Sequence, residues 1–339
     1  MRVSGQDEIG VCHRDVLGIV WRMRQQDYEI VGRKAVCGRC AVLAQVERIA
    51  PARPKTLTGA IIPVLLGSAL AFSDGQFKTA PALLCALFAC GMQIAANFIN
   101  DLFDFQKGTD RREDRLGPQR ACAEGWITPA AMKTGIGIAL TLSCLAGLAV
   151  LFTVWGQLPH GGWELVVLGV VCILFAFLYT TLLSYRGWGD VLVLVFFGFV
   201  PVCGTYYVQA YTLNMDVVVL SLVSGLAIDT LLMVNNYRDR EQDAVSGKCT
   251  LVVRYGKKFG ENMYLALGIA AVLLCFWFVY TGKLTPLEFI WAPCVYLYMH
   301  ALTWRKMIQI GSGKKLNSIL GETSRNMLFL GLLLAVALN

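Results

Sequence analysis

The chain has 339 residues, of which 56% are hydrophobic and only 16% are charged. The apolar residues stand in long blocks such as "VLVLVFFGFVPVC" that leave no polar face, which excludes a water-soluble globular protein. The formal net charge is +7, but the cations alternate with acids in short segments between the blocks, so no nucleic-acid partner is expected.

Residues 1–50 contain no apolar core of the length that a signal peptide needs. We expect them to form a cytoplasmic extension, separate from a transmembrane domain that covers residues 51–339. Cys37 and Cys40 form a single CxxC pair in this extension. Without a second pair, this spacing is weak evidence for a zinc or redox site.

Nine apolar blocks follow, each close to the roughly 20 helical residues that cross a bilayer core of about 30 Å. Backbone groups in lipid must bond internally, and no alternating barrel pattern is present, so the blocks are expected to be helices. The chain is therefore predicted to be an all-α integral membrane protein. The predicted spans are residues 57–74, 80–103, 131–154, 162–183, 188–211, 216–236, 262–281, 285–303 and 319–338.

Lysine and arginine collect in every second connection between the predicted spans. The connections assigned to the inner side hold Lys107, Arg111, Arg112, Arg115, Arg120, Arg186, Arg238, Arg240, Lys248, Arg254, Lys257, Lys258, Arg305, Lys306, Lys314 and Lys315. The outer connections hold only Lys78 and Lys283. By the positive-inside rule, the N-terminus is predicted to be cytoplasmic and the C-terminus outside, in an inner or cytoplasmic membrane.

Two acidic clusters lie where the second and sixth spans reach the predicted cytoplasmic side. The first reads "NFINDLFDFQKGTD" and contains Asn97, Asn100, Asp101, Asp104 and Asp110. The second reads "VNNYRDREQD" and contains Asn235, Asn236, Asp239 and Asp243. Side chains three or four positions apart share one helical face, so each cluster forms a polar stripe.

These carboxylates stand at helix C-termini, where each anion is unfavourable by roughly 0.3–1 kcal/mol, so a cation should offset them. Carboxylate and amide oxygens are ligands that Mg²⁺ takes together with water and phosphate oxygens. The two clusters are therefore predicted to hold Mg²⁺ and a diphosphate between them. The alternative is that the acids are solvated and pair with nearby cations; the repetition of the pattern favours a functional site.

Each cluster is followed by a basic loop that contains glycine. Arginine binds phosphate through a planar fork and lysine as a point charge. The candidate diphosphate contacts are Lys107, Arg115, Arg120, Lys248 and Arg254. Arg120 and Lys248 are favoured for their position near the motifs, although any of these cations could instead set topology or contact lipid head groups. The similar halves indicate an internal duplication with a pseudo-symmetric cavity between them.

The two motifs, "NDLFDFQKGTD" and "RDREQDAVSGKCTL", resemble the signatures of the UbiA superfamily of intramembrane prenyltransferases. From about residue 50 onward, stretches such as "GWGDVLVLVFFGFVPVCGTYYVQ" and "LNSILGETSRNMLF" are most similar to its 1,4-dihydroxy-2-naphthoate polyprenyltransferase branch. The resemblance implies nine helices around a central cavity, capped by the loops after the second and sixth helices, and Mg²⁺ dependence.

The first motif departs from the general pattern of the superfamily at one position. A further Asp usually stands four residues past the position of Asp104, whereas this chain has Gly108 there and Asp110 two residues beyond. Asp101 and Asp110 therefore both stay open as metal ligands beside Asp104. The expected metal ligands of the second motif are Asp239 and Asp243.

The expected reaction transfers a polyprenyl group from its diphosphate to 1,4-dihydroxy-2-naphthoate, with loss of CO₂ and diphosphate, to give demethylmenaquinone. The catalytic candidates are Asp101, Asp104, Asp239 and Asp243, which would stabilise the leaving diphosphate through Mg²⁺. A membrane-embedded cavity would keep water away from the allylic cation.

Tyr179, Asp190 and Asp229 are expected on the acceptor side, with packing or capping as the alternative. A lone carboxylate as deep as Asp229 costs roughly 2.5–3.5 kcal/mol on insertion scales, so it should face the cavity or a polar neighbour.

Two other functions stay open. One is prenyl transfer to a different acceptor, such as 4-hydroxybenzoate, homogentisate, or a haem or chlorophyll precursor. The other is cation transport. Transporter sites usually lie near the membrane midplane on broken helices, whereas these acids gather at helix ends, and this favours the enzyme.

Overall fold

The computed structural model describes residues 28–31, 34–37, 54–108, 115–179 and 183–339, and the chain divides into two compact units, residues 1–49 and 50–339. In the first unit, strands β1 (Tyr28–Val31) and β2 (Lys34–Cys37) pair antiparallel, a short hairpin that the sequence pattern did not predict. Cys40 of the CxxC pair lies outside the described residues. The cytoplasmic location of the first unit stays a prediction.

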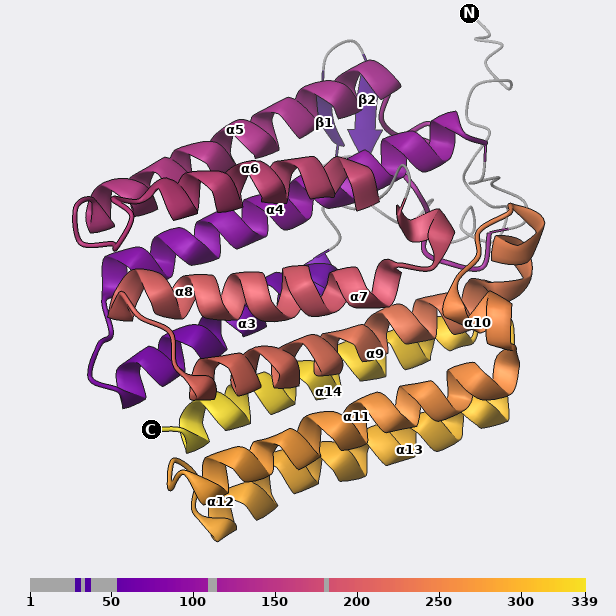
Figure 1. The fold of residues 1–339 in the computed structure, drawn as a ribbon. Helices are drawn as coiled ribbons and strands as arrows, with labels where there is room; N and C mark the ends of the chain where they lie inside the picture. The colour runs from indigo at the N-terminus through magenta and orange to yellow at the C-terminus, as the bar shows by residue number, and fades with distance from the viewer. Residues whose placement is uncertain (1–27, 32–33, 38–53, 109–114, 180–182) are drawn as a thin grey trace, which may run out of the picture. The chain divides into compact units, whose positions relative to one another are not determined.

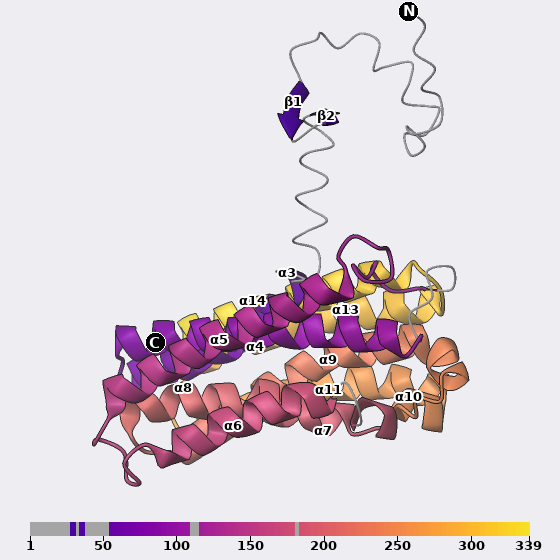
Figure 2. The same cartoon turned by 90° about the horizontal axis from the view of Figure 1, so that it is seen from above.

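The second unit is a bundle whose helices run back and forth between two ends (Figure 1, Figure 2). Its elements are α3 (Pro54–Ser73), α4 (Thr79–Gln106), α5 (Pro129–Val154), α6 (Trp163–Leu178), η4 (Ser184–Arg186), α7 (Gly189–Val193), η5 (Leu194–Phe199), α8 (Val200–Ala210), α9 (Met215–Val245), α10 (Leu251–Tyr255), α11 (Lys257–Tyr280), α12 (Pro286–Phe289), η6 (Ile290–Cys294), α13 (Val295–Ile310) and α14 (Leu316–Ala337).

Seven helical segments of the described residues are long and apolar enough to cross a membrane, with α7, η5 and α8 counted as one. The apolar helix α6 is shorter, at 16 residues. Together with the broken segment from α12 to α13, these passes match the nine predicted spans in order. The prediction of an all-α, multi-pass membrane domain is therefore confirmed.

The largest difference from the predicted spans lies at the end of α9. The predicted span stops at residue 236, where hydropathy falls, but the helix continues to Val245. The added turns, "YRDREQDAV", contain no Gly or Pro, and the helix ends just before Gly247, which adopts a positive φ of 76°. The second acidic motif is consequently helical over its whole length.

Two wide helical turns lie at or next to prolines of the bundle. The π-helical turn η5 precedes Pro201, and η6 contains Pro293. Proline removes a backbone donor and collides with the preceding turn, so a local change of helical pitch relieves the clash.

Glycines allow some helices to approach backbone to backbone. A Cβ atom on Gly67 of α3 would lie 2.6 Å from the Val202 carbonyl oxygen of α8, and one on Gly198 of η5 would lie 2.5 Å from the Ser221 carbonyl oxygen of α9. Small residues serve this purpose in membrane bundles, where packing replaces the hydrophobic effect.

The helix α9 is the most enclosed of the seven long segments. Of its most apolar window, 72% is buried, against 17% of the corresponding window of α4. The exposed surface of α5 and α6 carries large apolar side chains. These include Ile138, Leu142, Leu145, Phe152, Val167, Val170 and Leu174. An apolar surface of this extent fits contact with lipid.

A polar network joins connections at one end of the bundle. Asp74, after α3, accepts hydrogen bonds from the Tyr206 hydroxyl (2.6 Å) and from Lys283. Lys283 also pairs with Asp216 (3.7 Å), which accepts from the Trp277 indole N–H (2.7 Å). Burial alone would raise the pKa of the Asp74 carboxyl, but the hydrogen bonds from Lys283 and Tyr206 hold it below its usual value.

Replacing Gly198 with Ala is expected to destabilise the bundle, because the new methyl group would meet backbone of α9 at 2.5 Å. Overpacking of this kind costs about 1–3 kcal/mol. The apparent melting temperature of the purified protein in detergent should therefore fall. Gly137→Ala is the matched control, since its methyl group would have no neighbour within 4 Å. An unchanged melting temperature for Gly198→Ala would contradict this packing.

Candidate functional site

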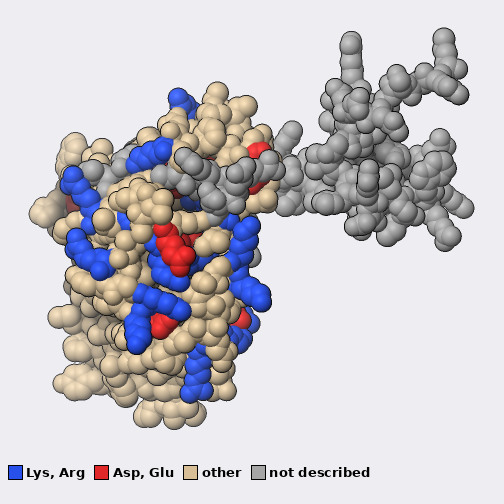
Figure 3. Space-filling view, turned by 90° about the vertical axis from the view of Figure 1, so that its right-hand side faces the viewer, with Lys and Arg blue, Asp and Glu red and all other residues tan. Residues whose placement is uncertain are grey.

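Both acidic motifs lie at the same end of the bundle, opposite the Asp74 network (Figure 1). We call it the motif end; it comprises the last turns of α4 and α9, residues 115–128 (the first loop), residues 183–188 and residues 246–250 (the second loop). Figure 3 looks onto this end and shows Lys and Arg side chains spread across it with fewer acids between them.

Asp101 fastens the first loop to α4. Its carboxylate accepts hydrogen bonds from the backbone N–H groups of Ala121 (3.0 Å) and Cys122 (3.1 Å), and the side chain is fully buried. Burial and the neighbouring Asp101 carboxylate raise the pKa of the Cys122 thiol to about 12. In this structure, Asp101 therefore stabilises the fold of the loop.

The next acid of the first motif is held by a cation. Asp104 pairs with the buried guanidinium of Arg120 at 3.1 Å. Lys107 lies 4.1 Å above the ring of Tyr185, which comes from the connection after α6. The backbone carbonyl of Tyr185 accepts from the N–H of Cys249 in the second loop, at 3.0 Å. Tyr185 thus links the end of α4 to the second loop.

The second motif is tied to the first loop through α14. Asp239 accepts two hydrogen bonds from Arg238, at 2.7 and 2.6 Å. Arg238 also donates to Asn317 (2.9 Å), and Asn317 donates to the Leu116 carbonyl in the first loop (2.8 Å). The first loop approaches so closely that a Cβ on Gly117 would lie 2.9 Å from the Arg238 guanidinium.

Asp243 pairs with Lys248 at 3.6 Å, and its second carboxyl oxygen is buried without a hydrogen-bond partner among the described residues. Of the other predicted contacts, Arg115 donates to the Pro118 carbonyl at 2.6 Å and Arg254 is exposed on α10. Asp110 lies outside the described residues.

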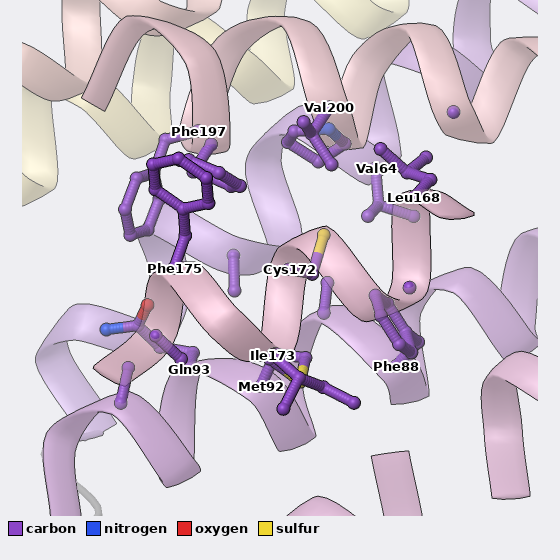
Figure 4. A pocket seen from close by; sticks show the side chains of 18 of the residues that line it. Val64, Phe88, Met92, Gln93, Leu168, Cys172, Ile173, Phe175, Phe197 and Val200 are labelled. Atoms are coloured by element: carbon purple, nitrogen blue, oxygen red, sulfur yellow. The ribbon is translucent and has the colours of Figure 1, made fainter. Parts of the chain in front are cut away.

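A cavity of about 630 Å³ extends from the motif end into the bundle. Cys85 and Asn100 of α4 both line it, and their separation along the helix corresponds to about 22 Å. Its walls are mainly apolar; Figure 4 shows Phe88, Met92 and Phe197 around the hollow, with Gln93 as the one amide among the labelled side chains. The space is suited to a long apolar ligand.

The amide side chains of both motifs meet at this cavity. Asn97 and Asn100 line it from α4, Asn235 lines it from α9, and Tyr179 lines it from the position directly after α6. Asn97 is further held by Gln93 and by Thr56 of α3. The motif carboxylates stand nearer the helix ends and do not line the cavity, but Tyr179 lies within electrostatic range of both Asp104 and Asp243.

The carboxylates do not form a metal cage by themselves. Among the residues that the structure describes, no three His, Cys, Asp or Glu side chains gather closely enough to hold a metal ion. The site does fit Mg²⁺ in another way, because this ion usually takes only one or two protein carboxylates and completes its shell with water and phosphate oxygens. The unpartnered oxygen of Asp243 is one available ligand.

Sequence reasoning missed two residues of the motif end. Arg238 was predicted only as a cation of an inner connection, with no role beside Asp239, and Asn317 is a polar residue at the start of a mostly apolar span. Both are brought to the site by contacts between distant parts of the chain. Only the occurrence of Asn317 in the family-like stretch "LNSILGETSRNMLF" could have pointed to it.

The bundle contains a long apolar cavity that leads to a charged end. This arrangement is typical of a membrane protein that binds an amphipathic molecule, with an apolar tail in the cavity and an ionic head at the charged end. The chain matches the sequence model of the UbiA prenyltransferase family over residues 60–318. It therefore belongs to the UbiA prenyltransferase family.

Curated relatives and solved structures agree with this assignment. The 1,4-dihydroxy-2-naphthoate octaprenyltransferase of Mycobacterium leprae is 34% identical over 300 residues, covering 86% of this chain and 95% of the relative. The enzyme of the same name from Escherichia coli K12 is 38% identical over 226 residues, covering 66% and 72%.

Two archaeal structures share the fold. A UbiA homologue from Aeropyrum pernix K1 has a TM-score of 0.62 at 15% identity, covering 84% of this chain and 97% of that chain. A UbiA homologue from Archaeoglobus fulgidus bound to DMAPP and Mg²⁺ has a TM-score of 0.57 at 14% identity, covering 86% and 99%.

Replacing Asp101 with Asn should release the first loop, because an amide offers one acceptor and places a donor against the second N–H group. Maleimide labelling of Cys122, read by mass spectrometry in metal-free detergent solution, should be slow in the wild type, where the residue is 3% exposed, and faster in the variant. Asp243→Asn is the control, since its partner Lys248 belongs to the second loop. Equal labelling of Cys122 in both variants would contradict the fastening role of Asp101.

Proposed function

We propose that this protein transfers a polyprenyl group from polyprenyl diphosphate to 1,4-dihydroxy-2-naphthoate, releasing CO₂ and diphosphate and forming demethylmenaquinol, the reduced form of demethylmenaquinone, because no oxidant takes part in the transfer. The observation that carries the proposal is the position of both acidic motifs at the charged end of one apolar cavity. The choice of acceptor is supported by relatives of that name, which are 28–38% identical over most of the chain.

Asp104, Asp239 and Asp243 are the motif acids best placed to hold Mg²⁺. Each faces a cation in this structure, so a metal can replace or join an existing positive charge. Asp101 is engaged with two backbone N–H groups, and its role as a ligand is secondary to its role in the loop. Bound Mg²⁺ would offset the negative charge that grows on the departing diphosphate.

The cations that now face the motif acids are the natural contacts for the substrate's diphosphate. Arg120 and Lys248 pair with Asp104 and Asp243, at 3.1 and 3.6 Å. Lys107, at the end of α4, lies over the ring of Tyr185, and Arg115, in the first loop, donates to the Pro118 carbonyl. Such groups lower the energy of a transition state in which charge moves onto phosphate oxygens. The exposed Arg254 is the least supported of the predicted contacts.

The cavity supplies the remaining requirements of the reaction. Its apolar walls hold the prenyl tail and keep water from the allylic carbon, so that a ring carbon captures it instead. The C–O bond to the diphosphate breaks, and a C–C bond forms at the carboxylated ring carbon. The bond to the carboxylate then breaks and CO₂ leaves.

The active end is proposed to face the cytoplasm, in an inner or cytoplasmic membrane, with a cytoplasmic N-terminus. The distribution of cations supports this orientation. Lys and Arg are spread over the motif end (Figure 3). Lys283 lies at the opposite end, in the Asp74 network.

Replacing Asp104 or Asp239 with Ala is expected to lower turnover by at least about 100-fold, since stabilisation of the leaving group is lost. The assay is product formation by purified, membrane-inserted protein with Mg²⁺. Glu241→Gln is the control, because Glu241 lies on the same helix as Asp239 with a side chain that is 77% exposed. Full activity of both alanine variants would remove the metal assignment.

Incubation with labelled polyprenyl diphosphate and one acceptor at a time is expected to give product with 1,4-dihydroxy-2-naphthoate. EDTA should stop the reaction and excess Mg²⁺ should restore it. If product formed with 4-hydroxybenzoate or homogentisate and none formed with the naphthoate, the proposed acceptor would be wrong. If the protein moved divalent ions into liposomes and transferred no prenyl group to any acceptor, the assignment as an enzyme would be wrong and that of a cation transporter would be supported.

A further inference from the structure

Two buried acids of the bundle have no part in the reaction described so far. Asp190 begins the pass that contains α7, and Asp229 lies in the middle of α9. They are 6% and 1% exposed, and one carboxyl oxygen of each has no hydrogen-bond partner in the described part of the chain. A buried oxygen without a partner is costly, and a ligand that donates a hydrogen bond to it recovers that cost.

Asp190 opens onto a small pocket beside the large cavity. The pocket holds about 20 Å³, roughly the space of one water molecule or one hydroxyl group. Tyr179 and Leu232 line both this side pocket and the large cavity, so the two spaces adjoin. A ring lying in the large cavity can direct one substituent into the side pocket.

Asp229 lies on the face of α9 that borders the side pocket. Leu232 and Asn236 line the pocket, and Asp229 precedes them by three and seven positions, which is one helical face. Asp229 and Asp190 lie within electrostatic range of each other, and Tyr179 lies within range of both. The three side chains therefore act on one small region next to the cavity.

The charge around the side pocket is divided. Asp190 contributes an acid and Lys248 a cation to its lining. Carboxylate oxygens accept hydrogen bonds, whereas an ammonium group only donates. A molecule that carries both hydroxyl and carboxylate groups on one ring matches this division, with its hydroxyl toward the acids and its carboxylate toward Lys248.

We infer that Asp190, Asp229 and Tyr179 form the subsite that binds the hydroxyl-bearing edge of the aromatic acceptor. This inference rests on the proposed function and assigns its acceptor a place. An acceptor hydroxyl donates a hydrogen bond to the unpartnered carboxyl oxygen of Asp190 or Asp229. The Tyr179 hydroxyl forms a hydrogen bond with the same edge of the ring. Lys248 stands between the two substrates: it pairs with Asp243 at the diphosphate end and also lines the side pocket, where the acceptor carboxylate would face it.

The subsite also provides a base that takes up the proton of the ring hydroxyl during prenyl transfer. The ring hydroxyl gives its proton to a carboxylate of the pair, and the electron pair of that oxygen moves into the ring. The ring carbon bonds the allylic carbon as the C–O bond to the diphosphate breaks. When the C–CO₂ bond breaks, its electrons return to the ring oxygen, which takes the proton back, so no other reactant is consumed.

The test compares Asp190→Asn and Asp229→Asn with wild type and with Glu241→Gln, all as full-length purified protein. Binding of 1,4-dihydroxy-2-naphthoate is measured by its fluorescence, and KM is measured for both substrates. Each Asn variant should weaken binding of the acceptor about tenfold or more, while KM for the prenyl diphosphate stays within about twofold.

Acceptors with one hydroxyl removed, 1-hydroxy-2-naphthoate and 4-hydroxy-2-naphthoate, provide a second measurement. The wild type should bind at least one of them more weakly than the dihydroxy compound, and the Asn variants should lose that discrimination. A purely structural role would not produce such a loss, since it would weaken all three compounds alike.

Unchanged acceptor binding in both Asn variants, or equal weakening for all three compounds, would overturn the subsite. Failure of the proposed function has a different signature, namely a wild-type protein that forms no naphthoate product. If the Asn variants have lower melting temperatures and raise KM for both substrates equally, the acids are structural and the subsite is refuted.

Discussion

Negative charge gathered at the ends of two membrane helices must be compensated, and the motif end is organised around that requirement. Asp104 faces Arg120, Asp239 faces Arg238 and Asp243 faces Lys248, while Asp101 faces backbone N–H groups. The chain thus balances its own acids without a ligand. In the proposed reaction, binding of a metal and a diphosphate would be an exchange of partners, in which the anion would take over the cations and the metal would take over the acids.

The same helix serves all three parts of the proposed site. The last turns of α9 carry the second motif, Asn235 of the turn above lines the cavity, and Asp229 lies deeper beside the side pocket. Because α9 is also the most enclosed long segment, its side chains hold their positions through packing on several sides. Distances between the leaving group, the tail and the acceptor are therefore fixed by one rigid element.

Hydropathy and residue spacing were sufficient for the helices and for the two motifs, because lipid forces apolar segments to be helical and one-turn spacing puts acids on one face. They could not supply contacts between distant residues. The link from Arg238 through Asn317 to Leu116 joins positions far apart in sequence, and the backbone bonds of Asp101 depend on the path of the first loop. The end of α9 was misplaced because hydropathy reports the membrane boundary and not the end of the helix.

The network around Asp74 bears on how the bundle can move. It fastens the connections after α3 and α11 to the start of α9, through ionic and hydrogen-bonded contacts on several sides. That end of the bundle is closed by contacts among the chain's own residues, so any widening of the cavity is expected at the motif end, where ion pairs can be exchanged.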